Sequence, residues 1–134
     1  MANRPPSSNP GGAEDMLSIL VVDDDPEYRE VIQSALEAEG WAVTSAGDGQ
    51  QALDQAVRCR PRLVVLDIGL PRVDGEGVAT GLRTAYGDTV PIVVVTADGH
   101  IVEKAQRVRA RAHLAKPFDL DDLCAAVRHA LGAS

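Results

Sequence analysis

The stretch ILVVDDDPE, residues 19–27, joins four apolar residues to three consecutive aspartates and then to a proline. An apolar run this short and this rich in aliphatic residues is typical of a buried strand. Pro26 fits the first turn of a helix, where its missing N–H leaves no hydrogen bond unmade. The stretch therefore predicts a buried strand that ends at Asp23 and is followed by a helix. Because adjacent like charges repel one another, we expect a compensating cation near the aspartates.

The same alternation continues along the chain. Short apolar runs predict strands at residues 17–22, 41–45, 63–66, 92–95 and 113–115. Apolar residues at helical spacing predict helices at residues 26–39, 50–59, 75–86, 99–109 and 119–131. The apolar stripe of the first predicted helix consists of Tyr28, Val31, Ile32, Ala35 and Leu36, and that of the second of Ala52, Leu53, Ala56 and Val57. Strands that alternate with helices indicate a parallel sheet with helices on both faces.

Size and composition bound the possible functions. A chain of 134 residues favours a single domain. Its formal net charge of −7 argues against general nucleic-acid binding, and no apolar run reaches membrane-spanning length. Cys59 and Cys124 lack metal-ligand spacing, so we interpret them as free thiols in a reducing, cytoplasmic compartment. Residues 1–15, rich in Pro, Gly, Ser and Asn, predict a disordered segment before a domain at residues 16–134.

Polar residues stand directly after four of the five predicted strands. Ligands of parallel sheets bind at the carboxyl ends of the strands. Asp23 and Asp24 follow the first strand, Asp67 the third, Thr96 the fourth and Lys116 the fifth. Carboxylates are suitable ligands for Mg²⁺, and an aspartate can accept a phosphoryl group. A hydroxyl and an ammonium can then bind the phosphoryl oxygens. We interpret the third aspartate of the triplet, Asp25, as a helix cap.

Four segments together carry a family resemblance: VVDDDP, VLDIGLPRVDG, VVVTAD and LAKPF, in this order. They resemble the receiver domain of bacterial two-component response regulators over Leu17–Leu131. The most specific segment is D-x-x-L-P-x-x-D-G at Asp67–Gly75. The resemblance implies a CheY-like, flavodoxin-like fold, a doubly wound (βα)5 sandwich. Its five-stranded parallel sheet has the order 2-1-3-4-5, with helices on both faces.

The resemblance also implies a mechanism. Asp67 is expected to accept a phosphoryl group from a histidine kinase or a histidine phosphotransfer protein, and Thr96 and Lys116 are expected to contact that group. The Lys116–Pro117 bond resembles one that is usually cis. Such a domain is a signalling domain that catalyses its own phosphorylation and dephosphorylation, not an enzyme for a separate substrate. Phosphorylation is expected to switch the face made by the fourth helix, fifth strand and fifth helix.

The implied metal site uses the acidic pair. Asp23 and Asp24 are expected to hold Mg²⁺ together with Asp67 and the backbone carbonyl of Gly69. Expected partners beyond the kinase are a downstream protein target or an output domain outside this chain. We expect no direct contact with nucleic acid or membrane, and a monomer or weak homodimer.

The sequence departs from the family pattern in its second half. His113 stands three residues before Lys116, where the family often has an aromatic residue, and we interpret it as a switch residue. Arg109 and Ala110 stand where many relatives have Gly-Ala. We therefore predict an irregular end to the fourth helix.

Two alternative functions remain open. A haloacid-dehalogenase-type phosphatase would use Asp23 as its nucleophile in an Asp-x-Asp motif, with Thr96 and Lys116 at later strand ends. It leaves Asp67 unexplained, and Pro26 and Glu27 depart from its pattern. The other alternative is an interaction module of the same fold that is never phosphorylated. The alternatives differ in which aspartate, if any, is phosphorylated.

Overall fold

The computed structural model describes residues 18–68, 75–86, 89–97 and 99–132. Its strands are β1 (Ser18–Val22), β2 (Ala42–Ala46), β3 (Leu63–Asp67), β4 (Ile92–Thr96) and β5 (Ala112–Ala115). Its helices are α2 (Pro26–Ala38), α3 (Gly49–Cys59), α4 (Gly75–Tyr86), α5 (Ile101–Arg107) and α6 (Leu120–Ala130). The predicted disordered segment 1–15 and Gly69 lie outside these ranges, so the domain boundary at residue 16 stays a prediction.

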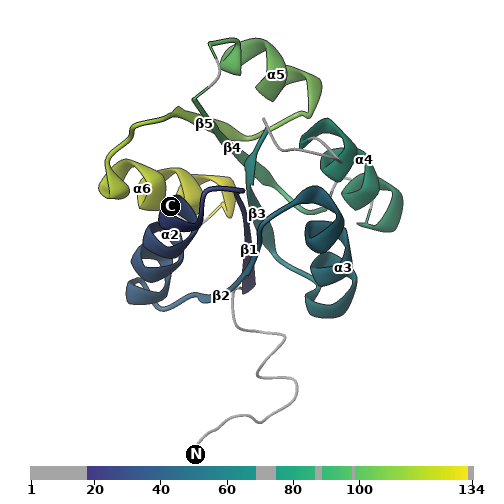
Figure 1. Cartoon of the computed structure of the whole chain (residues 1–134), viewed down its shortest axis with the longest axis horizontal. Coiled ribbons are helices and arrows are strands. Elements are labelled where there is room, and N and C mark those ends of the chain that lie inside the picture. Colours follow the sequence, from purple (N-terminus) through teal and green to yellow (C-terminus); the bar gives the residue numbers. More distant parts are fainter. Residues whose placement is uncertain (1–17, 69–74, 87–88, 98, 133–134) are drawn as a thin grey trace, which may run out of the picture.

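The strands form a single parallel sheet in the order β2-β1-β3-β4-β5. Helices α2 and α6 cover one face of this sheet, and α3, α4 and α5 cover the other (Figure 1). Every strand is followed by a helix. Each helix carries the chain back to the end of the sheet where the strands begin, so that all strands run in the same direction. The predicted doubly wound (βα)5 sandwich is confirmed.

The core consists of two apolar layers, one on each face of the sheet. In β1, Leu20 and Val22 pack under α3, whereas Ile19 and Val21 pack under α2 and α6. Because a strand alternates its side chains between the two faces, a strand covered on both sides must be apolar throughout. This explains the continuous apolar runs. Strand β2 is only half-buried and lies at the edge of the sheet.

The observed ends of most elements differ from the predicted ones by one or two residues. Strands β3 and β4 extend to include Asp67 and Thr96, because Asp67 pairs with Val95 and Thr96 pairs with Ala115. The two polar residues are therefore held in the sheet itself. This fixes their backbone positions at its carboxyl edge.

Helix α2 has well-defined signals at both ends. The Asp25 side chain accepts a hydrogen bond from Glu27 N at 2.9 Å, which confirms it as the N-cap. After the helix, Gly40 adopts a φ of 99°, and Trp41 N donates to Leu36 O. This is a Schellman-type end, in which a left-handed glycine lets the chain reverse. The start of the helix is thus fixed beside the ends of the strands.

Helix α5 ends where the sequence lacks the usual glycine. It stops at Arg107, although the stripe of apolar residues predicts a helix to Arg109. Arg109 itself adopts a φ of 56°, and Ala110 N donates to Ala105 O at 2.8 Å. The Schellman-type end is therefore kept with an arginine in the glycine position, where a side chain costs about 1 kcal/mol.

Within the described ranges, no helix is both long and apolar enough to cross a membrane. Cys59 and Cys124 are free thiols, as their spacing indicates. Burial raises the pKa of Cys124 above its usual value.

The two valines Val65 and Val57 provide a direct test of the layered core. Val65 in β3 is fully buried, whereas Val57 in α3 is 68% exposed. We expect Val65→Ala to lower the free energy of unfolding by about 2 kcal/mol, through lost burial and an unfilled cavity. Val57→Ala is expected to raise it by up to about 0.5 kcal/mol, because alanine is the better helix former. Urea unfolding followed by circular dichroism measures the free energy of unfolding of both variants. Similar losses of stability at both positions would contradict this assignment of the core.

Candidate functional site

The polar strand-end residues gather at the carboxyl edge of the sheet. Asp23 directly follows β1, and its N–H donates to Ala46 O at 3.1 Å. Asp67 and Thr96 are the last residues of β3 and β4. Lys116 follows β5, and its N–H donates to Thr96 O at 2.9 Å. Backbone hydrogen bonds and strand pairing therefore hold all four positions at this edge.

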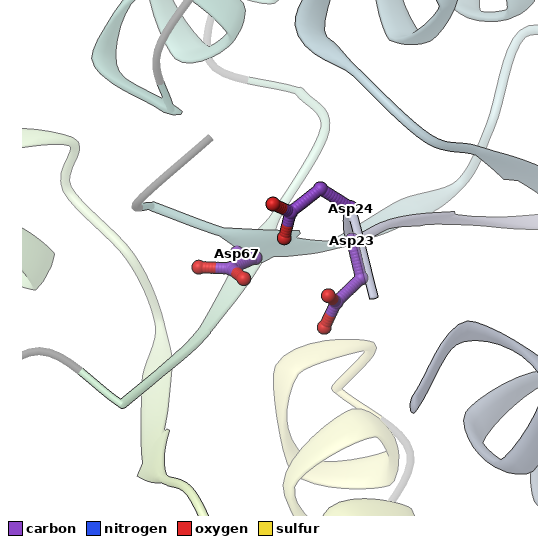
Figure 2. A group of neighbouring side chains, drawn as sticks. All are labelled: Asp23, Asp24 and Asp67. Atoms are coloured by element: carbon purple, nitrogen blue, oxygen red, sulfur yellow. The ribbon is translucent and has the colours of Figure 1, made fainter. Parts of the chain in front are cut away.

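Three carboxylates converge at this edge. Asp23, Asp24 and Asp67 each offer a carboxylate oxygen, and these atoms all lie within 4.8 Å of one another. Figure 2 shows Asp23 and Asp24 extending from the end of β1 and Asp67 from the end of β3. Asp23 is fully buried and Asp67 is 6% exposed, whereas Asp24 is exposed to solvent. Two of the three carboxylates are therefore buried, and the third, Asp24, faces solvent.

The Lys116 ammonium lies between two of these carboxylates. Its Nζ is 2.7 Å from Asp23 Oδ2 and 3.2 Å from Asp67 Oδ2. The Lys116 side chain is 10% exposed, so these ion pairs are shielded from water. Three carboxylates with one ammonium carry a net charge of −2.

Burial raises the pKa of Asp23 above its usual value, because removal from water disfavours the charged carboxylate. The Lys116 ammonium and the Asp25 N–H, which donates to Asp23 Oδ1 at 2.9 Å, oppose this effect without outweighing it. Burial also lowers the pKa of Lys116, but the Asp23 and Asp67 carboxylates outweigh burial, so the pKa of Lys116 is raised. Both pKa values are therefore raised, that of Asp23 by burial and that of Lys116 by its two carboxylate neighbours.

This donor set fits a divalent cation. Asp23 Oδ2 is buried, and the partner shown for it among the described residues is the Lys116 ammonium at 2.7 Å. Carboxylate oxygens are hard ligands of the kind that Mg²⁺ prefers, and Asp24 leaves the solvent side open for water ligands. A divalent cation would also neutralise the net charge of the group. The predicted fourth ligand, Gly69, lies outside the described residues.

An open cavity of about 770 Å³ adjoins the carboxylates. It is lined by Asp24, Asp25, Tyr28, Asp67, Thr96, Ala97, Lys116 and Pro117. Asp67 therefore faces the cavity with the hydroxyl-bearing Thr96 and the ammonium of Lys116. Asp23 is not part of this lining and is fully buried. A phosphatase that uses Asp23 as its nucleophile is consequently not favoured, because a substrate in the cavity would meet Asp67.

The structure thus brings together the residues that the sequence singled out as strand ends. The Lys116–Pro117 peptide bond is cis, as the resemblance implies. His113 is exposed on β5, and its role as a switch residue stays a prediction. Sequence reasoning missed Tyr28, which it assigned to the apolar stripe of α2. The ring of Tyr28 lies under the Lys116 ammonium, 4.3 Å from Nζ to the ring centroid.

Comparison with known proteins identifies the family. Residues 19–128 match the model of the response regulator receiver domain, so the chain belongs to this family. The fold, the acidic group and the family together define a signalling domain of two-component systems that acts as a phosphoacceptor.

Among curated proteins, the chain is 44% identical over 114 residues to response regulator MprA of Mycolicibacterium vanbaalenii, covering 84% of this chain and 49% of that protein. It is 41% identical to response regulator MprA of Mycobacterium leprae, with 84% and 50% covered. The chain therefore spans about half the length of the curated relatives it matches.

Among solved structures, the chemotaxis protein CheY4 of Vibrio cholerae matches with a TM-score of 0.79 and 27% identity, over 86% of this chain and 98% of that one. Response regulator TrrA of Thermotoga maritima, solved in complex with Mg²⁺-BeF, matches with a TM-score of 0.76 and 33% identity, over 85% and 98%.

Proposed function

We propose that Asp67 is the phosphoacceptor of this receiver domain and that Mg²⁺ binds at Asp23, Asp24 and Asp67. One observation carries the assignment: among the carboxylates described here, Asp67 alone belongs to the acidic group, lines the cavity and contacts the Lys116 ammonium. Asp24 also lines the cavity but is exposed to solvent. Response regulator TrrA, which shares this fold, was solved in complex with Mg²⁺-BeF, and this supports Mg²⁺ binding by this chain.

The roles of the side chains follow from phosphoryl-transfer chemistry. The Asp67 carboxylate attacks phosphorus in line with the leaving group, while negative charge spreads over the equatorial oxygens. The Lys116 ammonium is placed to bind one of these oxygens, and the Thr96 hydroxyl is placed to donate to another. Bound Mg²⁺ supplies further positive charge at the phosphoryl group. With these groups in place, the domain catalyses its own phosphorylation and, by attack of water, its dephosphorylation.

The phosphoryl group is expected to act as a switch through β4 and β5. It adds charge and acceptor oxygens beside Thr96, the last residue of β4, and Lys116, the residue that follows β5. Movement of these residues toward the phosphoryl group would shift the surface formed by α5, β5 and α6. This surface is therefore the proposed partner-binding face.

The proposed phosphodonor is a histidine kinase or a histidine phosphotransfer protein in the cytoplasm. The matched curated relatives are about twice as long as the aligned region, which supports an output domain or a separate protein target as the recipient of the signal. A monomer or weak homodimer without direct nucleic-acid or membrane contact remains the proposed state.

The test is intact mass spectrometry after incubation with a small acyl phosphate. We expect the wild-type protein to gain one phosphoryl mass only when Mg²⁺ is present. Asp23→Asn should raise the Mg²⁺ concentration for half-maximal phosphorylation by about tenfold or more, because one ligand loses its charge. The matched control is Asp54→Asn, an exposed aspartate on α3. A phosphoryl gain independent of Mg²⁺, or a loss of function with Asp54→Asn, would contradict the proposal.

A further inference from the structure

We infer that Tyr28 is a positioning residue that holds the Lys116 ammonium beside Asp67 through its aromatic face. This inference rests on the proposed function, because it concerns the same phosphoacceptor site. The ring of Tyr28 lies in the first turn of α2 and lines the cavity with Asp67 and Lys116. Lys116 Nζ is 4.3 Å from the ring centroid, well within the range of a cation–π interaction.

The Tyr28 ring also contacts a second aromatic ring. Tyr28 and Phe118 are in contact, with ring centroids 5.8 Å apart and a tilt of 48°. Tilted aromatic pairs at this distance are favourable. Phe118 follows Lys116 and Pro117 in the segment that leads into α6, and α2 and α6 cover the same face of the sheet (Figure 1). Tyr28 thus joins α2 to the segment that carries the lysine.

The Lys116 ammonium has three partners among the described residues, and they differ in whether they can also bind a metal ion. Two are the Asp23 and Asp67 carboxylates, which are also proposed Mg²⁺ ligands. A bound cation competes with the ammonium for these oxygens and weakens both ion pairs. The Tyr28 ring is neutral and offers no carboxylate to a metal, so its attraction for the ammonium persists when a cation is bound.

Lysine needs such a partner because its side chain is a flexible four-carbon stem that ends in a compact charge. Without a fixed partner, the ammonium of the metal-bound protein would move toward solvent and lose its alignment with the phosphoryl oxygens. A misplaced cation stabilises the transition state less, because its position must match the developing charge. Tyr28 is therefore expected to affect the rate of phosphoryl transfer and not only stability.

The experiment measures the initial rate of phosphorylation by a small acyl phosphate at saturating Mg²⁺. Tyr28→Leu removes the aromatic face but keeps an apolar side chain, and we expect the rate to fall about 3- to 10-fold. Tyr28→Phe keeps the ring and should stay within about twofold of the wild type. If the leucine variant does not fold, Tyr28→Met serves the same purpose. Val31→Ala, at an exposed position on the same helix, is the control and should leave the rate unchanged.

A double-mutant cycle separates positioning from general structural damage. In a Lys116→Ala background, adding Tyr28→Leu should cause no further loss of rate, because the ring then has no ammonium to hold. An equal loss in both backgrounds, or a wild-type rate for Tyr28→Leu, would overturn the inference. Asp67→Asn is measured in parallel. If Asp67→Asn abolishes phosphorylation but the double-mutant cycle shows no coupling between Tyr28 and Lys116, only this inference fails. If Asp67→Asn is still phosphorylated, the proposed function fails.

Discussion

Asp67→Asn is expected to abolish the gain of one phosphoryl mass on incubation with Mg²⁺ and a small acyl phosphate. The amide lacks the negative charge and the nucleophilic oxygen that attack phosphorus. Its size matches that of the carboxylate, so the variant should fold and still end β3. Intact mass spectrometry measures the adduct, and circular dichroism checks the fold.

The result identifies the acceptor among several carboxylates at the same edge. An adduct that persists in Asp67→Asn would show that another residue is phosphorylated and would reopen the phosphatase that uses Asp23. The absence of an adduct in the wild type as well would favour the interaction module, provided that acid-quenched kinetics detect no donor turnover. Burial of Asp23 and exposure of Asp67 to the cavity are the reasons to expect neither outcome.

Lys116→Ala is expected to have two large effects. The first is on stability: removal of the ammonium leaves the buried Asp23 carboxylate without its cation, which costs about 3 kcal/mol in free energy of unfolding. The second is on phosphorylation, which should slow by about 100-fold because a cation at the transition state is lost. Urea unfolding without Mg²⁺ measures the first effect, and the initial rate of adduct formation at saturating Mg²⁺ measures the second.

Mg²⁺ distinguishes an electrostatic loss from a packing defect in this variant. A cation that binds only the folded protein stabilises that protein. Mg²⁺ should stabilise Lys116→Ala more than the wild type, because the carboxylates of the variant have no competing ammonium. Arg58→Ala, at an exposed position on α3, is the matched control and should change neither the free energy of unfolding nor the rate of phosphorylation appreciably. Equal stabilisation of wild type and Lys116→Ala by Mg²⁺ would contradict the proposed location of the cation site.

Much of this protein could be predicted because its patterns are local. A buried parallel strand needs an unbroken apolar run, and a helix that covers the sheet needs apolar residues at its own spacing. The order of strands and helices follows, as does the role of Asp25 as a cap. The missing glycine at the end of α5 could also be read from the sequence, but the left-handed conformation that Arg109 adopts there could not.

Prediction was weakest where the direction of a side chain depends on a neighbouring element. The stripe of α3 includes both Ala56 and Val57, but only Ala56 is buried, because successive helical residues point about 100° apart. The stripe of α2 includes Tyr28, whose ring contacts Lys116 as well as the core. Sequence spacing shows that such residues are close to an apolar face, but it does not show what they contact.

The sequence by itself determined the alternating architecture, because strands and helices have different periodicities of apolar residues, and it determined which polar residues stand at the ends of β1, β3, β4 and β5. Only the tertiary structure decided how these groups meet. Lys116 reaches Asp67 across 49 positions of the chain, and the same ammonium contacts Asp23, which is fully buried while Asp67 faces the cavity. Contacts of this kind depend on the register of the strands and on the packing of α2 and α6 against them, and no local pattern encodes these distances.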